Sequence, residues 1–132
     1  MIPLPWIIGA GLAGIFGVAA VVYHWDDILE WLHDFLPKVS NMLRSIAKKI
    51  SLFEHVAYMI ADKIDNVTAK IEHRLYHKRQ DGLYEEEITR RTLPPSELPA
   101  FAKKKLEMKR RGQIEEADIT PELEKEVGYS IS

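Results

Sequence analysis

The prediction of the fold depends on residues 38–77, which read KVSNMLRSIAKKISLFEHVAYMIADKIDNVTAKIEHRLYH. Apolar side chains recur along this stretch at alternating intervals of four and three residues. They are Val39, Leu43, Ile46, Ile50, Phe53, Ala57, Ile60, Ile64, Val67 and Ile71. No proline or glycine interrupts the series. An unbroken heptad pattern of this length predicts one long helix that associates as a coiled coil or an oligomerising bundle.

These residues are therefore candidate oligomerisation residues, and their types indicate how many copies associate. β-branched side chains such as Ile50 and Val67 occupy both core positions of the heptad, which disfavours a parallel dimer and favours three or more copies. Met42, Leu52 and Val56 widen the apolar face, so the helix needs neighbours on two sides. A ring or bundle of identical chains supplies them. The alternative is a helix that packs on the chain's own C-terminal segments.

An uncharged apolar run precedes this helix, between Trp6 and Trp25. As a helix it is roughly 28 Å long, close to the hydrocarbon thickness of about 30 Å. Aromatic residues stand at both ends, as they do at membrane interfaces. We therefore expect residues 1–25 to form a transmembrane domain whose residues 5–23 cross the bilayer once. A signal peptide is the alternative, but no basic residue precedes the run.

Small residues spaced four apart run through the expected span, and such spacing lets membrane helices approach closely. The candidate transmembrane packing residues are Gly9, Ala10, Ala13, Gly14 and Gly17. Basic residues follow the span, beginning with Lys38, and none precedes it. Because basic flanking residues prefer the cytoplasmic side, we expect the N-terminus outside and the C-terminus in the cytoplasm, with membrane lipids among the partners.

Residues 26–37 (DDILEWLHDFLP) form an acidic amphipathic juxtamembrane segment. Apolar residues follow a helical period on one side, and acidic residues occupy the other. Helices that lie on a membrane surface usually carry basic residues on their polar face. The apolar stripe is therefore expected to pack against neighbouring copies or a partner. Pro37 is expected to kink or end the helix.

The remaining residues, 78–132, form a polar, charged tail with short helices. Residues 78–82 are typical of a helix end that stops at a glycine, whereas residues 83–93 fit either a short strand or a docking segment. Start and stop signals predict short helices over 96–111 and 121–127. Such a tail can also bind other proteins.

Composition and motifs exclude several classes of function. The absence of cysteine excludes disulfides, thiolate catalysis and cysteine zinc sites. The net charge is −2, and the basic residues of 103–111 have acidic counterparts nearby in sequence, so we expect no nucleic-acid partner.

Two histidines have the spacing that most resembles that of a metal site. His73 and His77 are four residues apart and share one face if they lie in a helix. A zinc site needs three or four ligands, and the sequence indicates no third, so no metal or cofactor is expected. No phosphate loop, nucleophile elbow or cofactor fingerprint occurs, and we do not expect an enzyme.

The sequence thus predicts an all-α membrane protein: one N-terminal transmembrane helix, a long amphipathic coiled-coil-like helix, and a polar tail with short helices. The leading functional hypothesis is a single-pass, membrane-anchored, homo-oligomeric scaffold that assembles through its cytoplasmic helix. The alternative is a small oligomeric pore-forming or membrane-disrupting effector. The span lacks the intramembrane polar residues that mark transport pathways, which favours the scaffold.

Overall fold

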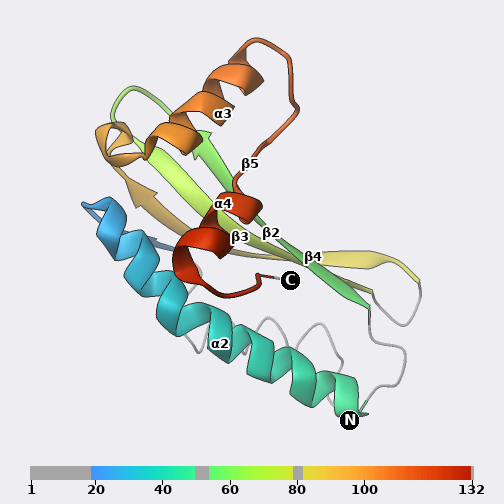
Figure 1. The fold of residues 1–132 in the computed structure, drawn as a ribbon. Helices are drawn as coiled ribbons and strands as arrows, with labels where there is room; N and C mark the ends of the chain where they lie inside the picture. The colour runs from blue at the N-terminus through green and yellow to red at the C-terminus, as the bar shows by residue number, and fades with distance from the viewer. Residues whose placement is uncertain (1–18, 50–53, 79–81, 132) are drawn as a thin grey trace.

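The computed structural model describes residues 19–49, 54–78 and 82–131, which form a mixed α/β fold (Figure 1). The elements in chain order are β1 (Ala19–Val21), α2 (Trp25–Lys49), β2 (His55–Lys63), β3 (Ala69–Lys78), β4 (Tyr84–Leu93), the 3-10 turn η1 (Pro95–Glu97), α3 (Ala100–Arg110), β5 (Ala117–Asp118) and α4 (Thr120–Val127). The strands form one sheet in the order β1-β4-β3-β2-β5. All pairings are antiparallel except that of β1 with β4.

The long hairpin of β2 and β3 is closed by turn chemistry around Asp65. The backbone N–H groups of Ile64 and Asp65 donate to the carbonyl oxygen of Thr68, at 2.9 and 3.3 Å. The Asp65 carboxylate accepts a hydrogen bond of 2.7 Å from the N–H of Val67. An aspartate that binds the backbone two residues further on stabilises a turn and competes with a helix.

The predicted coiled-coil helix over residues 38–77 is therefore wrong beyond Lys49. The helix ends there, and residues 55–78 form two antiparallel strands. On β3 the core residues Ile71, His73 and Leu75 occupy alternate positions, because successive side chains of a strand point to opposite faces. Glu72 is also buried, but on the opposite face. The heptad spacing crosses these strands by coincidence and selects residues from both faces.

Helix α2 buries the apolar stripe that the sequence indicates. Ile28, Leu32 and Phe35 are fully buried, and the stripe continues beyond Pro37 through Val39 and Leu43. The stripe packs on the chain's own sheet, which corrects the expectation that it faces neighbouring copies. Of the two outcomes expected at Pro37, a kink or an end of the helix, the end is wrong, because α2 contains this proline in its interior. Burial of the stripe on both sides of it stabilises the continuous helix.

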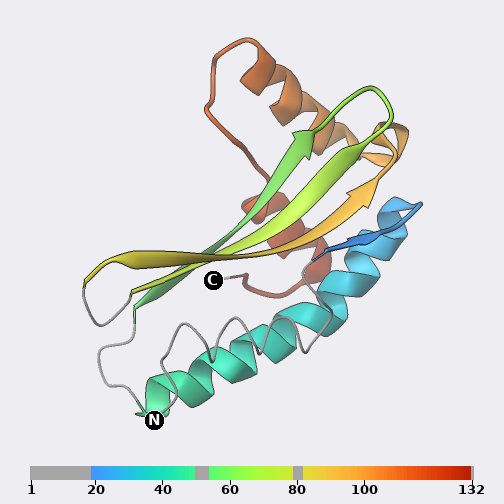
Figure 2. The same cartoon turned by 180° about the vertical axis from the view of Figure 1, so that it is seen from behind.

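The helices gather on one face of the sheet, here called the inner face. Phe35 of α2 contacts the ring of His73 on that face, while Leu123 and Val127 of α4 join the same core. Near the start of α2, Trp25 meets Phe101 of α3 edge-on. From behind, the strands stand in front of α3 and α4 (Figure 2). The other face of the sheet, the outer face, carries no helix from the described ranges.

The membrane predictions are contradicted by the structure. The last residues of the predicted span, Ala19–Val21, form β1, which pairs with β4. Among the described residues, no helix combines the length and the apolarity that crossing a bilayer requires. The all-α membrane fold, the single pass and its outside-to-cytoplasm orientation are therefore wrong. The pore hypothesis depends on the same span and loses its basis with it. The rest of the span lies outside the described residues.

The C-terminal half follows its local signals more closely. Helices α3 and α4 correspond to the helices predicted over 96–111 and 121–127, although α3 begins only at Ala100 after η1. Gly128 ends α4 with a left-handed φ of 71°. The helix end predicted over 78–82 is wrong, since Lys78 is the last residue of strand β3. Residues 84–93 form strand β4, one of the two predicted options.

Candidate functional site

The outer face of the central strands carries aromatic side chains among charged ones. Cross-strand register and alternation assign its members: Val56, Tyr58, Ile60 and Asp62 on β2; Lys70, Glu72, Arg74, Tyr76 and Lys78 on β3; and Tyr84, Glu86, Ile88, Arg90 and Thr92 on β4. A sheet face that meets water is usually polar. On this face, Tyr58 remains 38% exposed and Tyr84 54% exposed.

Hydrogen bonds to their hydroxyl groups fix two of the three tyrosine rings. The Tyr84 hydroxyl donates to Oε2 of Glu54 at 2.9 Å, and the Tyr76 hydroxyl donates to the carboxylate of Glu86. The Glu86 hydrogen bond raises the pKa of Tyr76. Tyr58 and Tyr76 stack edge to face, with ring centroids 6.1 Å apart. The rings are thus held in place by contacts within the chain.

These rings line a groove of about 480 Å³ that extends to the edge strand β5. Its lining residues are Val56, Tyr58, Ile60, Arg74, Tyr76, Tyr84, Glu116 and Asp118. Arg74 lies 3.4 Å from carboxylate oxygens of both Glu72 and Glu116. Burial alone would lower the pKa of Arg74, but the two carboxylates raise it. The cation in the groove is therefore neutralised within the chain.

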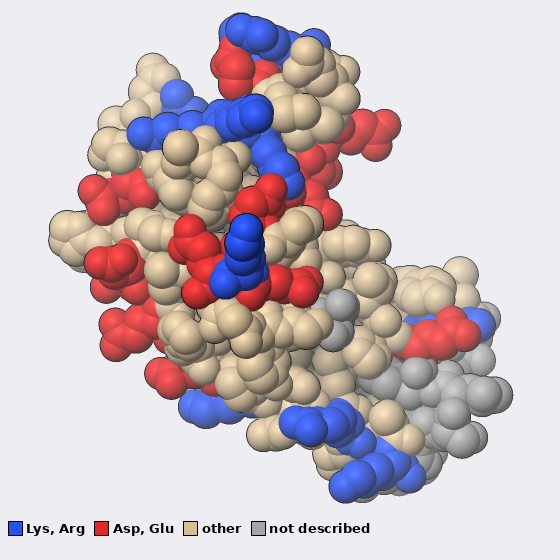
Figure 3. Space-filling model, in the orientation of Figure 1, with Lys and Arg blue, Asp and Glu red and all other residues tan. Residues whose placement is uncertain are grey.

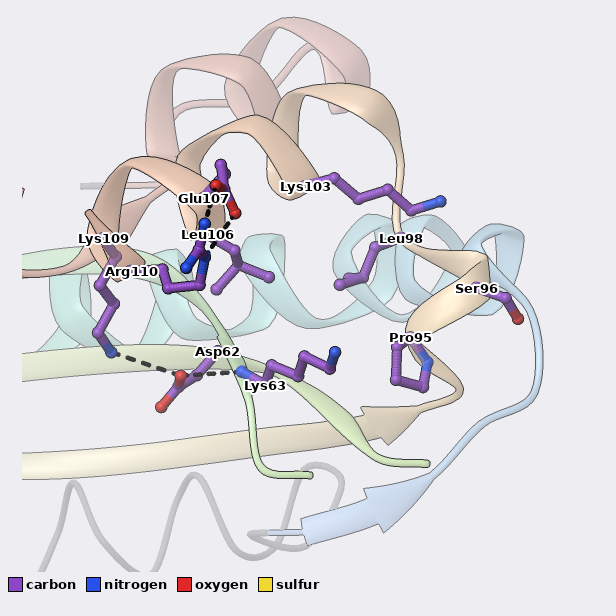
Figure 4. A pocket seen from close by; sticks show the side chains of 10 residues that line it. All are labelled: Asp62, Lys63, Pro95, Ser96, Leu98, Lys103, Leu106, Glu107, Lys109 and Arg110. Atoms are coloured by element: carbon purple, nitrogen blue, oxygen red, sulfur yellow. Dashed lines mark hydrogen bonds and ion pairs between the residues drawn. The ribbon is translucent and has the colours of Figure 1, made fainter. Parts of the chain in front are cut away.

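A second pocket, of about 630 Å³, lies between α3, η1 and the end of β2 (Figure 4). Lys63 and Lys103 reach into it from β2 and α3. Lys109 bridges Asp62 and Glu116, with both Nζ–O distances at 3.4 Å.

The basic cluster of α3 is largely paired within the chain. Arg110 and Arg111 both bind Glu107, with N–O distances of 2.5 and 3.1 Å, and hold the pKa of that carboxyl at about 2. Lys105 binds Glu122 at 2.8 Å. Figure 3 shows the basic side chains over α3 with acidic ones beside them. The ion pairs of Lys105, Lys109, Arg110 and Arg111 thus neutralise most of the basic cluster on α3.

Polar residues that face inward form a third candidate site, near the loop that joins β3 to β4. His73 and His77 both face inward from β3, but four strand residues separate them by roughly 13 Å, so they cannot share one ion. His77 instead meets Glu85 and Glu87 of β4, and donor atoms of the three residues lie within 4.8 Å of one another. Sequence reasoning missed this group because it placed His77 in a helix.

The ten predicted oligomerisation residues are scattered by the fold. Five are buried in the core: Val39, Leu43, Ile46, Ala57 and Ile71. Ile60 lies on the outer face at 5% exposure, while Ile64 and Val67 are exposed at the hairpin turn. Ile50 and Phe53 lie outside the described residues, as do the packing residues Gly9, Ala10, Ala13, Gly14 and Gly17. Self-association itself stays a prediction.

The tyrosines of the outer face had a signal in the sequence that the helical interpretation concealed. If residues 55–78 are taken as two strands of a hairpin, every second residue of each strand lies on the same face of the sheet. Tyr58 and Tyr76 then fall on one face.

Comparison of the chain with protein-family models, with curated proteins and with solved structures gave no match.

Proposed function

We propose that this chain is a structural protein that assembles with copies of itself through the outer face of its sheet. The observation that carries the proposal is the groove between Tyr58, Tyr76 and Tyr84. Tyrosine and arginine are enriched in protein interfaces, because a large rigid ring or a planar guanidinium gives contact area at a small entropic cost.

The electrostatics of the groove support its burial in an interface. An unpaired charge taken out of water costs several kcal/mol, whereas a charge that keeps its partner costs much less. Arg74 keeps Glu72 and Glu116, and Lys70 keeps Glu72 at 2.5 Å. A second copy can therefore cover the tyrosines without leaving these charges unpaired.

The distribution of charges on the outer face favours a copy of this chain as the partner. In a two-fold contact each residue meets the same surface on the other subunit, so the surface must complement itself. Acidic and basic groups both lie beside the rings: Glu54 and Glu86 accept hydrogen bonds from two of them, and Arg74 is the cross-strand neighbour of Tyr58. A face that carries both signs and two sets of rings can complement itself in a two-fold contact. The apolar stripe of α2 is not available for assembly, because it forms the core.

The test measures the mass of the full-length chain in solution by light scattering and sedimentation. The wild type is expected at a multiple of 15.2 kDa. The double variant Tyr58→Ser/Tyr84→Ser removes two exposed rings and is expected at the mass of one chain. Tyr23→Ser is the matched control, because Tyr23 is 70% exposed but lies in the connection between β1 and α2.

Two results would contradict the proposal. The first is a wild type that stays at the mass of a single chain at every concentration. The second is an oligomer that survives in the double variant while circular dichroism shows an unchanged fold, because assembly would then use another surface.

A further inference from the structure

We infer that His77, Glu85 and Glu87 form a binding site for a divalent transition-metal ion, with Zn²⁺ as the probe. The site lies on the inner face at the end of the β3–β4 hairpin, away from the outer face that the proposed self-association uses. It is therefore independent of that proposal.

Strand register brings the three side chains together. His77 is paired with Glu85 across the β3–β4 ladder, and Glu87 is paired with Leu75, two residues before His77. Side chains two apart on a strand share a face, so both carboxylates lie on the histidine's side of the sheet. The backbone of two long paired strands thus fixes the positions from which all three side chains project, which suits a site of defined geometry.

The distances fit a metal ion with small side-chain movements. Zinc lies about 2.0–2.2 Å from nitrogen and oxygen ligands, so two ligands of a tetrahedral ion are roughly 3.4 Å apart. The Nε2 of His77 lies 3.8 Å from Oε1 of Glu87, and the three donor atoms lie within 4.8 Å of one another. Rotations about side-chain bonds can close these gaps without a change in the backbone.

The surroundings of the donors favour a cation. The side chain of His77 is fully buried, and that of Glu87 is only 23% exposed. Burial and the neighbouring Glu85 raise the pKa of Glu87, which reflects the cost of two carboxylates placed together away from water. A divalent ion removes that cost by neutralising both. Burial also lowers the pKa of His77 and so favours the neutral imidazole that binds metals.

The donor set indicates the class of metal. One imidazole nitrogen with two carboxylate oxygens suits zinc, manganese or ferrous iron, whereas magnesium and calcium prefer oxygen ligands alone. Three protein ligands leave at least one coordination position for water.

The experiment titrates ZnCl₂ into the full-length, chelator-treated chain by calorimetry and follows the thermal midpoint with and without the ion. We expect one ion per chain and a higher midpoint. Glu87→Gln keeps the shape of the side chain and removes its charge, and it is expected to weaken binding by at least about tenfold. Glu85→Gln/Glu87→Gln is expected to abolish binding. Glu86→Gln is the matched control, because this carboxylate lies between them in sequence but on the outer face.

The inference is overturned if the wild type binds no zinc, or if the double variant binds it as tightly as the wild type does. Circular dichroism verifies that the variants fold. Should the double variant not fold, Glu87→Gln alone decides: unchanged affinity in a folded Glu87→Gln chain rejects the site. Zinc binding by a chain that remains a single copy would support the metal site while contradicting the proposed assembly.

Discussion

Phe35 of α2 meets the imidazole of His73 on β3 edge to face, with ring centroids 5.1 Å apart and an angle of 80° between the planes. Both side chains have no exposed surface. Neither ring nitrogen of His73 has a hydrogen-bond partner among the described residues, and the same holds for the hydroxyl of Thr89, which is paired with His73 on β4. The contact between helix and sheet is thus built around a neutral imidazole.

This contact makes stability dependent on pH. Burial lowers the pKa of His73 from 6.5 to about 4 in the folded chain. Between these values the unfolded chain binds a proton that the folded chain does not, so the stabilisation present above pH 6.5 is lost as pH falls toward 4. The loss from this residue amounts to about 3 kcal/mol. Urea unfolding across this range, in the presence of a chelator, measures it.

His73→Leu is the control for this prediction. The variant lacks the proton-binding group, and its free energy of unfolding should fall less on acidification. A smaller dependence remains, because burial also lowers the pKa of His77. At neutral pH the variant should be at least as stable as the wild type, since leucine leaves no buried polar atom without a partner. An equally steep pH dependence in His73→Leu would show that other groups cause it.

Pro37→Ala should stabilise the chain by about 1–3 kcal/mol, because a proline in a helix interior has no N–H to donate and strains the preceding turn. The new N–H in α2 can donate to the carbonyl of His33. Pro121→Ala is the control: this proline stands in the first turn of α4, where the missing N–H has no partner within the helix, so no comparable gain is expected. Chemical denaturation of both variants compares the two positions. Equal gains would contradict the explanation.

Gly128→Ala should destabilise the chain by about 1 kcal/mol. Gly128 has a φ of 71° and donates its N–H to the carbonyl of Glu124 at 2.8 Å, which closes α4. An added Cβ would meet no atom within 4 Å, so the cost arises from the backbone conformation and not from crowding. Gly128→Asn should cost less, because asparagine tolerates the left-handed region. Thermal unfolding ranks the three chains, and the reverse order of alanine and asparagine would refute the argument.

Local signals predicted some elements well and others poorly, for a physical reason. Helix α4 begins at a Thr-Pro pair and ends at a glycine, and such signals act within a few residues. The heptad spacing is valid from Val39 to Ile46, inside α2, and fails from Ala57 onward. Apolar intervals of four and three residues do not distinguish a helix from a strand whose second face is also partly apolar. The helical interpretation overlooked the turn at Asp65, whose carboxylate binds the N–H of Val67.

The candidate sites were less predictable than the elements. The carboxylates around His77 come from another strand, and the tyrosines of the outer face come from three strands. Their grouping follows from register, and a shift of one residue would move every side chain to the opposite face.

By itself, the amino-acid sequence determined the short helix that ends before Gly128 and the separation of apolar from charged side chains along α2. These properties depend on neighbours within one or two turns of backbone. Only the tertiary structure decided which segments pair, that His77 meets Glu85 and Glu87, and that tyrosines of three strands share the outer face of the sheet. Those outcomes depend on hydrogen bonds and core packing between segments distant in sequence, which no local period encodes.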